Sequence, residues 1–285
     1  MGFQIIQDME TVIELTGLSK DEFAKELGVS RVTLHNWLSG KRDVNEMYMN
    51  FFYEYTFNKG IRLNKIKEQL YKEDVVGKSR KILFHGAKTK IEGELRLDCS
   101  KQKNDFGNGF YCGESLEQSA MFVATFPDSS LYMLEFCQEN LVERKFSVCR
   151  DWILMIAYFR ERLGEHAQSE LIQRLVRDNR GVDYIVAPIA DNRMFEIIDQ
   201  FIDGEITDVQ CQHCLSATNM GNQYVLVSEK ALRQIQILER CYLPNSEKES
   251  YLNSRKESYE LDRDKVKVAR RQYRDQGNYI EDILK

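Results

Sequence analysis

The pairing of a His-Gly dipeptide with a later glycine-rich aromatic run is the feature that most restricts how this chain folds. A short apolar segment at residues 81–84 leads directly into His85 and Gly86. Further along, glycines and aromatic residues are interleaved in Asp105-Phe106-Gly107-Asn108-Gly109-Phe110-Tyr111. Glycine permits backbone conformations that other residues avoid. The segments therefore predict a strand that ends at His-Gly, a tight turn that delivers Tyr111, and a helix over 115–126.

From residue 81 onward, short β-rich runs are interspersed with helical stretches. Such a mixture predicts an α+β domain. We expect three parts: an all-helical domain over residues 1–78, the α+β domain over 79–244 and a charged helical tail over 245–285, whose apolar end docks on the body. Strands are expected over 82–84, 131–137, 183–188 and 223–228, and helices over 115–126, 152–163, 166–177 and 193–201.

A second set of signals, in residues 11–40, predicts two short helices joined by a turn. Ser19 and Glu22 have the spacing of a capping box, and Ser30 is placed to cap a helix over 31–38. The pattern F-A-x-x-L-G-V-S-x-x-T-L-x-x-W-x-x-G-K-R is similar to the helix-turn-helix of Cro and the lambda-type repressors. The resemblance implies that the second helix enters the DNA major groove. It places Ser30, Arg31, Thr33 and Asn36 toward DNA, with Lys41 and Arg42 on phosphates.

Two roles for this helix-turn-helix stay open. It binds DNA, in which case a homodimer would supply specificity, or it has lost DNA binding and mediates protein contacts. Val32 and Trp37 are expected to pack inward. Residues 44–75 are expected to continue as helix, and their apolar side chains recur at helical spacing as a core face. These side chains are Met47, Tyr48, Phe51, Phe52 and Tyr55.

Charge and cysteine content exclude several classes of protein. A formal net charge of -5 argues against a strongly basic nucleic-acid binder. No apolar run approaches the ~20 residues that a membrane helix needs, and the N-terminus lacks signal-peptide features, so we expect a cytoplasmic protein with no membrane partner. Seven cysteines indicate reduced thiols. Cys211-Gln-His-Cys214 has metal-like spacing but no second pair, so we expect buried thiols and no metal.

The motifs of residues 81–122 resemble the NAD-binding signature of the ADP-ribosyltransferase superfamily, on its poly(ADP-ribose) polymerase and diphtheria-toxin side. Those enzymes read H-G, F-G-x-G-x-Y and S-A-x-Y, and here Phe122 replaces the last Tyr. The resemblance implies two split, small β-sheets with NAD, the substrate, in the cleft between them. Nicotinamide would stack between Tyr111 and Phe122, and its carboxamide would bind Gly86 and Ser119. The implied NAD contacts are His85, Gly86, Phe106, Gly107, Gly109, Tyr111, Ser119 and Phe122.

The third family motif carries the main departure. The family has Glu within N-E-Y followed by apolar residues, and this chain has Gln223 in Asn222-Gln223-Tyr224-Val225-Leu226-Val227. A glutamine keeps a hydrogen bond but lacks the charge. Loss of one preorganised interaction costs on the order of 100- to 1,000-fold in rate. Three interpretations follow: slow or mono-ADP-ribosyl transfer, catalysis with another carboxylate, or NAD binding without turnover.

Residues from 81 onward also resemble a bacterial branch of that superfamily, of unknown function, in which glutamine is usual at this position. Two further blocks, at 182–192 and 223–232, carry that resemblance. In the first, Asp191 and Asn192 follow an expected strand, and polar loops at strand ends commonly carry function. Asp191 is therefore either the missing carboxylate, an acceptor-binding residue or the N-cap of the helix over 193–201.

The resemblances together imply an NAD-dependent mono-ADP-ribosyltransferase that modifies a protein or nucleic acid and is fused to a helix-turn-helix. His85, Tyr111 and Gln223 would form its catalytic triad. Such fusions suggest a toxin–antitoxin or phage-defence setting. Two alternatives are an NAD hydrolase or NAD-sensing DNA-binding regulator, and a transcription factor with an inactive C-terminal domain. Fold-level analogy does not decide between them.

Overall fold

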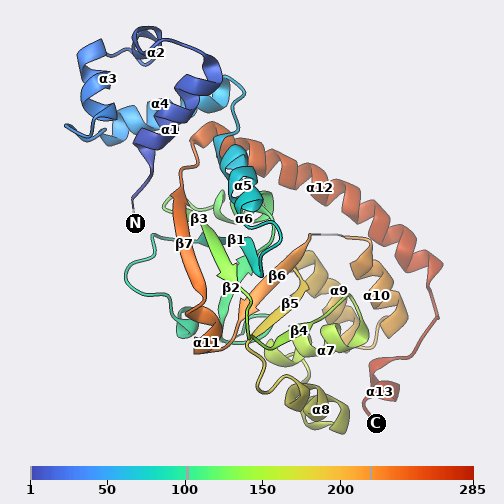
Figure 1. The fold of residues 1–285 in the computed structure, drawn as a ribbon. Coiled ribbons are helices and arrows are strands. Elements are labelled where there is room, and N and C mark those ends of the chain that lie inside the picture. Colours follow the sequence, from blue (N-terminus) through green and yellow to red (C-terminus); the bar gives the residue numbers. More distant parts are fainter. Residues whose placement is uncertain (1, 101–102, 219) are drawn as a thin grey trace.

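The structure, a computed structural model, describes residues 2–100, 103–218 and 220–285 (Figure 1). Helices α1–α4 form a separate N-terminal lobe, and the remaining elements surround one sheet of seven strands. The predicted α+β class with a helical N-terminal region is confirmed. Within the described ranges, no helix is both long and apolar enough to cross a membrane.

The N-terminal lobe begins its helices where local caps place them. The Ser19 hydroxyl accepts from the Glu22 amide at 3.3 Å, and the Glu22 carboxylate accepts from the Ser19 amide at 2.9 Å. This confirms the predicted capping box. Ser30 accepts from the Thr33 amide at 3.0 Å and caps the next helix. The lobe consists of α1 (Ile5–Thr16), α2 (Lys20–Glu26), α3 (Arg31–Leu38) and α4 (Glu46–Asn58).

The single helix predicted over 44–75 is wrong, because a break at Gly60 separates α4 from α5 (Leu63–Asp74). Gly60 has a φ of 84°, a conformation that disfavours residues with side chains. The predicted core face is also too wide. Phe52 is fully buried, but Met47 and Phe51 are 66% and 47% exposed. Only part of the predicted core face therefore lies in the lobe's interior.

The seven strands lie in the order β4-β5-β6-β2-β1-β3-β7. Strands β4 and β5 are parallel, and the other neighbours are antiparallel. β1 and β3 pair over eight residues, whereas β1 and β2 meet only at Phe84↔Gly113. The strands are β1 (Arg80–Ala87), β2 (Phe110–Gly113), β3 (Ser130–Cys137), β4 (Glu143–Lys145), β5 (Tyr184–Pro188), β6 (Asn222–Leu226) and β7 (Ile235–Cys241).

The prediction of two separate sheets is wrong, because Phe84↔Gly113 joins the halves β4-β5-β6-β2 and β1-β3-β7 into one sheet. This single pair is nevertheless a narrow join. Beyond it, His85 and Gly86 pair with β3 but not with β2, while Tyr111 pairs with β6 but not with β1. The two strands therefore separate beside the residues that carry the sequence motifs.

Helices cover the sheet in two groups. One core lies between the β5–β6 side and α7–α10, with Trp152, Ile185 and Val225 at its centre. The other lies under α6, where Phe84 and Leu116 pack together. The expected helices are observed with shifted ends, whereas α10 and α11 were not predicted. The helices are α6 (Leu116–Val123), α7 (Arg150–Phe159), α8 (Glu170–Asp178), α9 (Asn192–Ile202), α10 (Asp208–Ser216) and α11 (Glu229–Leu232).

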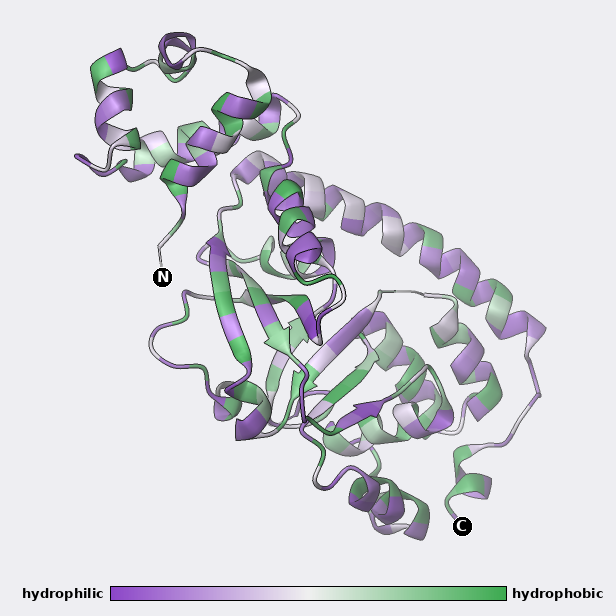
Figure 2. Cartoon of the chain, viewed as in Figure 1, coloured by the Kyte–Doolittle hydropathy of each residue, from purple (hydrophilic) through white to green (hydrophobic). Residues whose placement is uncertain are grey.

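The C-terminal segment is a long, mostly hydrophilic helix followed by a short docked one (Figure 2). α12 (Asn245–Gln272) runs along the outside of the body (Figure 1). α13 (Ile280–Ile283) places Ile280 and Leu284 in the core of α7–α10, where both are buried. The predicted charged tail with an apolar docking end is therefore confirmed.

The N-terminal lobe contacts the sheet domain near the end of β7. The rings of Tyr53 and Tyr242 stack with centroids 4.3 Å apart. Lys67 of α5 bridges Asp8 of α1 at 2.8 Å and Glu239 of β7 at 2.9 Å. Because the three charged side chains are largely buried, this contact is part of the folded core.

Candidate functional site

The motif residues lie in or next to one row of paired residues that crosses the sheet. Phe84 pairs with Gly113, Gly113 pairs with Gln223, and Gln223 pairs with Ala187. His85 follows Phe84 directly. The His-Gly pair, the aromatic run and the late glutamine are thus brought to the narrow join, although their positions range from 85 to 223.

His85 lies across the join between β1 and β2. Its Nδ1 is 2.7 Å from the Tyr111 carbonyl oxygen, and its ring stacks on Phe110 with centroids 4.4 Å apart. Burial lowers the pKa of His85, and the hydrogen bond to the Tyr111 carbonyl opposes that shift. Because a carbonyl can only accept, Nδ1 carries the proton. A neutral His85 therefore offers Nε2 as an acceptor for a ligand hydroxyl.

The predicted triad is divided between the two faces of the sheet. Tyr111 pairs with Val225, and Gln223 lies two positions before Val225 in β6, so both project from the same face. His85 stacks on Phe110, which precedes Tyr111 and projects from the opposite face. A ligand that contacts all three must therefore occupy the join itself.

The glycine-rich run shapes a turn against which Tyr111 is anchored. The Tyr111 hydroxyl donates to the Gly107 carbonyl at 2.8 Å and accepts from the Phe106 amide at 3.1 Å. Gly107 has a φ of 73°, as a tight turn requires. A Cβ on Gly109 would lie 2.9 Å from the Leu226 carbonyl oxygen. The turn and its close approach to β6 thus require glycine whatever the site binds.

The aromatic side chains are less clustered than the resemblance implies. Phe106 is buried and packs on Phe146 with centroids 5.6 Å apart, so its backbone, not its ring, is left for ligand contact. Phe122 is half-exposed on α6, and its ring contacts Phe126. No ring contact between Tyr111 and Phe122 is found among the described residues. The nicotinamide slot between them stays a prediction.

Helix α6 packs directly on the strands that carry the glycines. A Cβ on Gly86 would lie 2.7 Å from a Val123 methyl and 3.1 Å from the Phe122 ring. The Ser119 hydroxyl donates to the Phe84 carbonyl at 3.4 Å and would be 2.9 Å from a Cβ on Gly113. Gly86, Ser119 and Phe122 are thus adjacent, as the motif implies. Helix packing alone also accounts for the glycine at 86.

Asp191 is the N-cap of α9. Its Oδ1 accepts from the amides of Arg193 and Met194 at 3.0 and 3.1 Å, and its Oδ2 accepts from the Arg193 guanidinium at 2.9 Å. The N-cap interpretation is therefore confirmed, with the helix starting at Asn192. Both carboxylate oxygens are engaged, so Asp191 is poorly placed to serve as the missing carboxylate. An acceptor-binding role for the Asp191–Asn192 loop stays a prediction.

The carboxylate beside Gln223 is Asp105, the first residue of the aromatic run. Gln223 Nε2 donates to Asp105 Oδ2 at 2.9 Å, and Arg160 donates to Asp105 Oδ1 through Nε at 3.0 Å and Nη2 at 2.9 Å. The sequence interpretation missed both partners. The only available signal was an acidic residue directly before Phe-Gly, and no local signal marked Arg160 at the end of α7.

Cys211 and Cys214 lie on α10 and are buried, free thiols, as predicted. Burial raises the pKa of both thiols, which favours the protonated, unreactive form. In the part of the chain that the structure describes, no group of three His, Cys, Asp or Glu side chains could hold a metal ion.

The helix-turn-helix presents an exposed face on α3. Arg31 is 3.0 Å from Asp21 and largely exposed, so this ion pair is weak and the guanidinium remains accessible. Val32 is 67% exposed, which corrects the expectation that it packs inward. Thr33 and Asn36 are partly exposed, Lys41 and Arg42 are exposed, and Ser30 is engaged as the helix cap.

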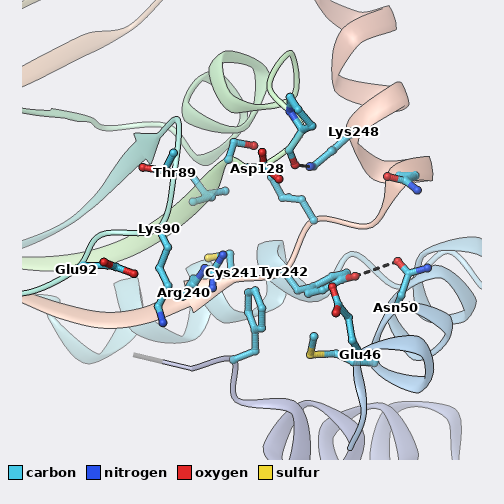
Figure 3. Close-up of a pocket in the computed structure, with 17 residues that line it drawn as sticks. Glu46, Asn50, Thr89, Lys90, Glu92, Asp128, Arg240, Cys241, Tyr242 and Lys248 are labelled. Carbon is cyan, nitrogen blue, oxygen red and sulfur yellow. Dashed lines mark hydrogen bonds between the residues drawn. The ribbon is translucent and has the colours of Figure 1, made fainter.

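A cavity of about 740 Å³ lies between the N-terminal lobe and the end of β7 (Figure 3). The predicted triad does not line it. Three cationic and three acidic side chains balance around it, so its charge favours no charged ligand. They are Lys90, Arg240 and Lys248, and Glu46, Glu92 and Asp128.

Two family models match this chain, and each covers one of the two groups of sequence motifs. A family model described as "Protein of unknown function (DUF3990)" matches residues 81–237, which include the His-Gly pair, the aromatic run and Gln223. A model described as "Helix-turn-helix" matches residues 11–48. No curated protein and no solved structure matches the chain.

Proposed function

This chain belongs to the DUF3990 family, and from that premise we propose that its sheet domain is an NAD-dependent mono-ADP-ribosyltransferase acting on a protein or nucleic acid. The family description names no activity, so the proposal rests on this chain's own residues. One observation carries it: the three motif segments, distant in sequence, meet at the join beside Phe84↔Gly113↔Gln223.

The residues at the join suit the chemistry that this reaction requires. The bond between nicotinamide and ribose breaks, nicotinamide leaves with the electron pair, and a nucleophile of the acceptor attacks the ribose carbon and loses its proton. Neutral His85 can accept from one ribose hydroxyl, and the Gln223 carbonyl can accept from another. Both act without net charge, so they stabilise developing positive charge on the ribose through their dipoles. This supports single, slow transfers.

The direct test is nicotinamide release from labelled NAD by the full chain, alone and with cell lysate or DNA. Calorimetry with Phe122→Ala isolates the binding step, because this side chain is half-exposed and its loss should leave the fold intact. NAD affinity should fall by about 0.5–1.5 kcal/mol or more. The matched control is Phe51→Ala, an exposed phenylalanine in the N-terminal lobe. Equal affinity in wild type and Phe122→Ala would contradict the proposed nicotinamide slot.

For the N-terminal lobe we propose sequence-specific DNA binding through α3, which the helix-turn-helix match supports. Arg31 and Val32 are exposed side chains that suit base edges and thymine methyl groups. We predict that Arg31→Ala weakens specific binding by about 1–3 kcal/mol and that Lys41→Ala lowers the salt slope by about one. Lys25→Ala, on α2, is the control. If selection from random DNA at low salt yields no preferred sequence, the protein-contact alternative is favoured.

The packed contact between the lobe and the sheet domain supports a second candidate, an NAD-sensing DNA-binding regulator. The Tyr53–Tyr242 stack and the Lys67 bridges give the two parts a common interior. In a sensor, NAD would bind without release of nicotinamide and would change DNA affinity. Reciprocal measurement of NAD affinity with and without DNA distinguishes this candidate, because linkage requires equal factors in both directions.

A further inference from the structure

The amide of Gln223 has its orientation set by its neighbours. Its nitrogen lies 2.9 Å from Asp105 Oδ2 and 3.2 Å from the Pro188 carbonyl oxygen. Neither a carboxylate nor a carbonyl can donate a hydrogen bond. Both N–H groups of Gln223 are therefore used by these acceptors, and the side-chain oxygen must lie on the other side of the amide.

Asp105 is in turn held by a cation. Arg160 donates two hydrogen bonds to Oδ1, which leaves Oδ2 for Gln223. The Arg160 guanidinium lies 3.3 Å over the centroid of the Phe195 ring, which fixes its plane. Burial raises the pKa of Asp105, and Arg160 and the Gln223 amide partly offset that rise. The cluster is a series of side-chain contacts from Phe195 through Arg160 and Asp105 to Gln223.

Gln223 Oε1, at the end of this series of contacts, is available to a ligand. No donor in the described residues contacts Gln223 Oε1. This oxygen is not among the fully buried side-chain atoms without a partner, so it retains contact with solvent. An acceptor held in this way binds a hydroxyl or another donor group and repels an anion.

The same geometry disfavours an ionised glutamate at position 223. A carboxylate there would face Asp105 Oδ2 and the Pro188 carbonyl, two acceptors, at hydrogen-bond distance. Two facing carboxylates cannot both be ionised, and one must retain a proton. Glutamine therefore fits this position because Asp105 is present.

We propose that Asp105, anchored by Arg160, is a positioning residue that holds Gln223 Oε1 toward a donor group of the substrate and makes glutamine the matching side chain. The identity of that group as a ribose hydroxyl rests on the proposed function. The orientation of the amide does not depend on it.

The first arm of the test measures thermal unfolding of Gln223→Glu, Asp105→Asn and the double variant. Gln223→Glu should lower Tm by roughly 4–8 °C at pH 8, and less at pH 5, where a shared proton relieves the repulsion. In the double variant, the amide introduced at position 105 could still accept from Arg160 and could donate to the carboxylate introduced at position 223. The double variant should therefore recover at least half of the loss.

The control for this arm pairs Gln223→Glu with Asp199→Asn, from the surface ion pair with Arg162. These two substitutions should show additive losses, because their sites share no partner. Additivity in the cycle of Gln223→Glu with Asp105→Asn would overturn the proposal.

The second arm separates positioning from mere support of the fold. Folded Asp105→Asn should lower kcat for nicotinamide release by about 100-fold, with KM for NAD changed by less than about threefold. The double variant should release nicotinamide faster than either single variant. An unchanged kcat in folded Asp105→Asn would overturn the positioning role. A wild type that neither binds nor cleaves NAD, with coupling intact in the first arm, would overturn the proposed function while supporting the assigned orientation of Gln223.

Discussion

Two buried charge clusters in this protein differ in how their charges balance. In the site cluster, one carboxylate is matched by one guanidinium, and the third member is neutral. In the interface cluster, between the N-terminal lobe and the sheet, two carboxylates share one ammonium group. The site cluster is Asp105, Arg160 and Gln223, and the interface cluster is Asp8, Lys67 and Glu239.

The imbalance makes the interface cluster dependent on a single cation. Glu239 is fully buried, and its Oε2 has no hydrogen-bond partner within the ranges described. Burial raises the pKa of Glu239, whereas Lys67 lowers it. Asp8 gains a further hydrogen bond from the Tyr53 hydroxyl at 2.5 Å. The comparison teaches that paired charges orient a side chain at the site, whereas at the interface two carboxylates depend on one lysine to join the two parts of the molecule.

The largest expected effect follows from removing that cation. Lys67→Met would leave Asp8 and Glu239 buried without a partner of opposite charge. We predict a loss of about 3–5 kcal/mol in the free energy of unfolding, as for other broken buried pairs. Urea denaturation at pH 8 measures it. Lys265→Met is the control, since this lysine is 60% exposed beside Asp262 and its loss should cost about 0–1 kcal/mol. Equal costs for the two variants would remove the contrast between buried and exposed pairs.

A second prediction concerns the pH dependence of stability that a buried glutamate near the same interface, Glu247, should cause. Burial raises the pKa of Glu247 to about 7, and its carboxylate accepts from Tyr251 at 3.2 Å and from Asn64 at 3.5 Å. The folded state then binds more protons than the unfolded state between about pH 4.5 and 7. Stability from this group is present below that window and is lost as pH rises through it, by about 3 kcal/mol.

Glu247→Gln should flatten the dependence of unfolding free energy on pH between pH 5 and pH 8. Denaturant titrations at both pH values, for wild type and variant, give the difference directly. A slope that the substitution leaves intact would contradict the raised pKa of Glu247.

The smallest effect is expected on the site side. Tyr111→Phe removes the hydroxyl that bonds the Gly107 carbonyl and the Phe106 amide, but it keeps the ring. We predict a loss of about 1–2 kcal/mol, visible as a drop in Tm of roughly 2–8 °C. Tyr279→Phe, an exposed tyrosine at the start of α13, is the control and should leave Tm unchanged. A loss as large as that of Lys67→Met would mean that the neutral hydrogen bonds of Tyr111 stabilise the fold as much as the buried charges of the interface cluster do.

Much of the N-terminal lobe could be predicted from the sequence because its signals are local. Ser19 and Ser30 bond to amides only three residues away, and α3 spans Arg31–Leu38 as expected. In the sheet domain, four apolar runs were recognised as strands, but β2, β4 and β7 were missed. β4 has three charged residues, and β7 mixes polar and apolar ones, so their pairing with neighbouring strands decides their conformation.

For the site, the sequence pointed to His85, Gly86 and Gln223 through a family resemblance. Their residue types would not have marked them without it. The contact between Asp105 and Gln223 spans most of the sheet domain's sequence. It depends on the turn at Gly107 and on the register Gly113↔Gln223. Neither can be read from neighbouring residues, so no local pattern explains why glutamine stands at position 223.

The sequence by itself determined the α+β class, the helix caps of the lobe and the turns that need glycine, because each depends on backbone preferences within a few residues. The tertiary structure decided that the strands form one sheet instead of two, which side chains of α4 are exposed, and which carboxylate lies beside Gln223. These outcomes depend on which distant segments pack together. Burial then sets the strength of each charge and hydrogen bond, and no local pattern carries that information.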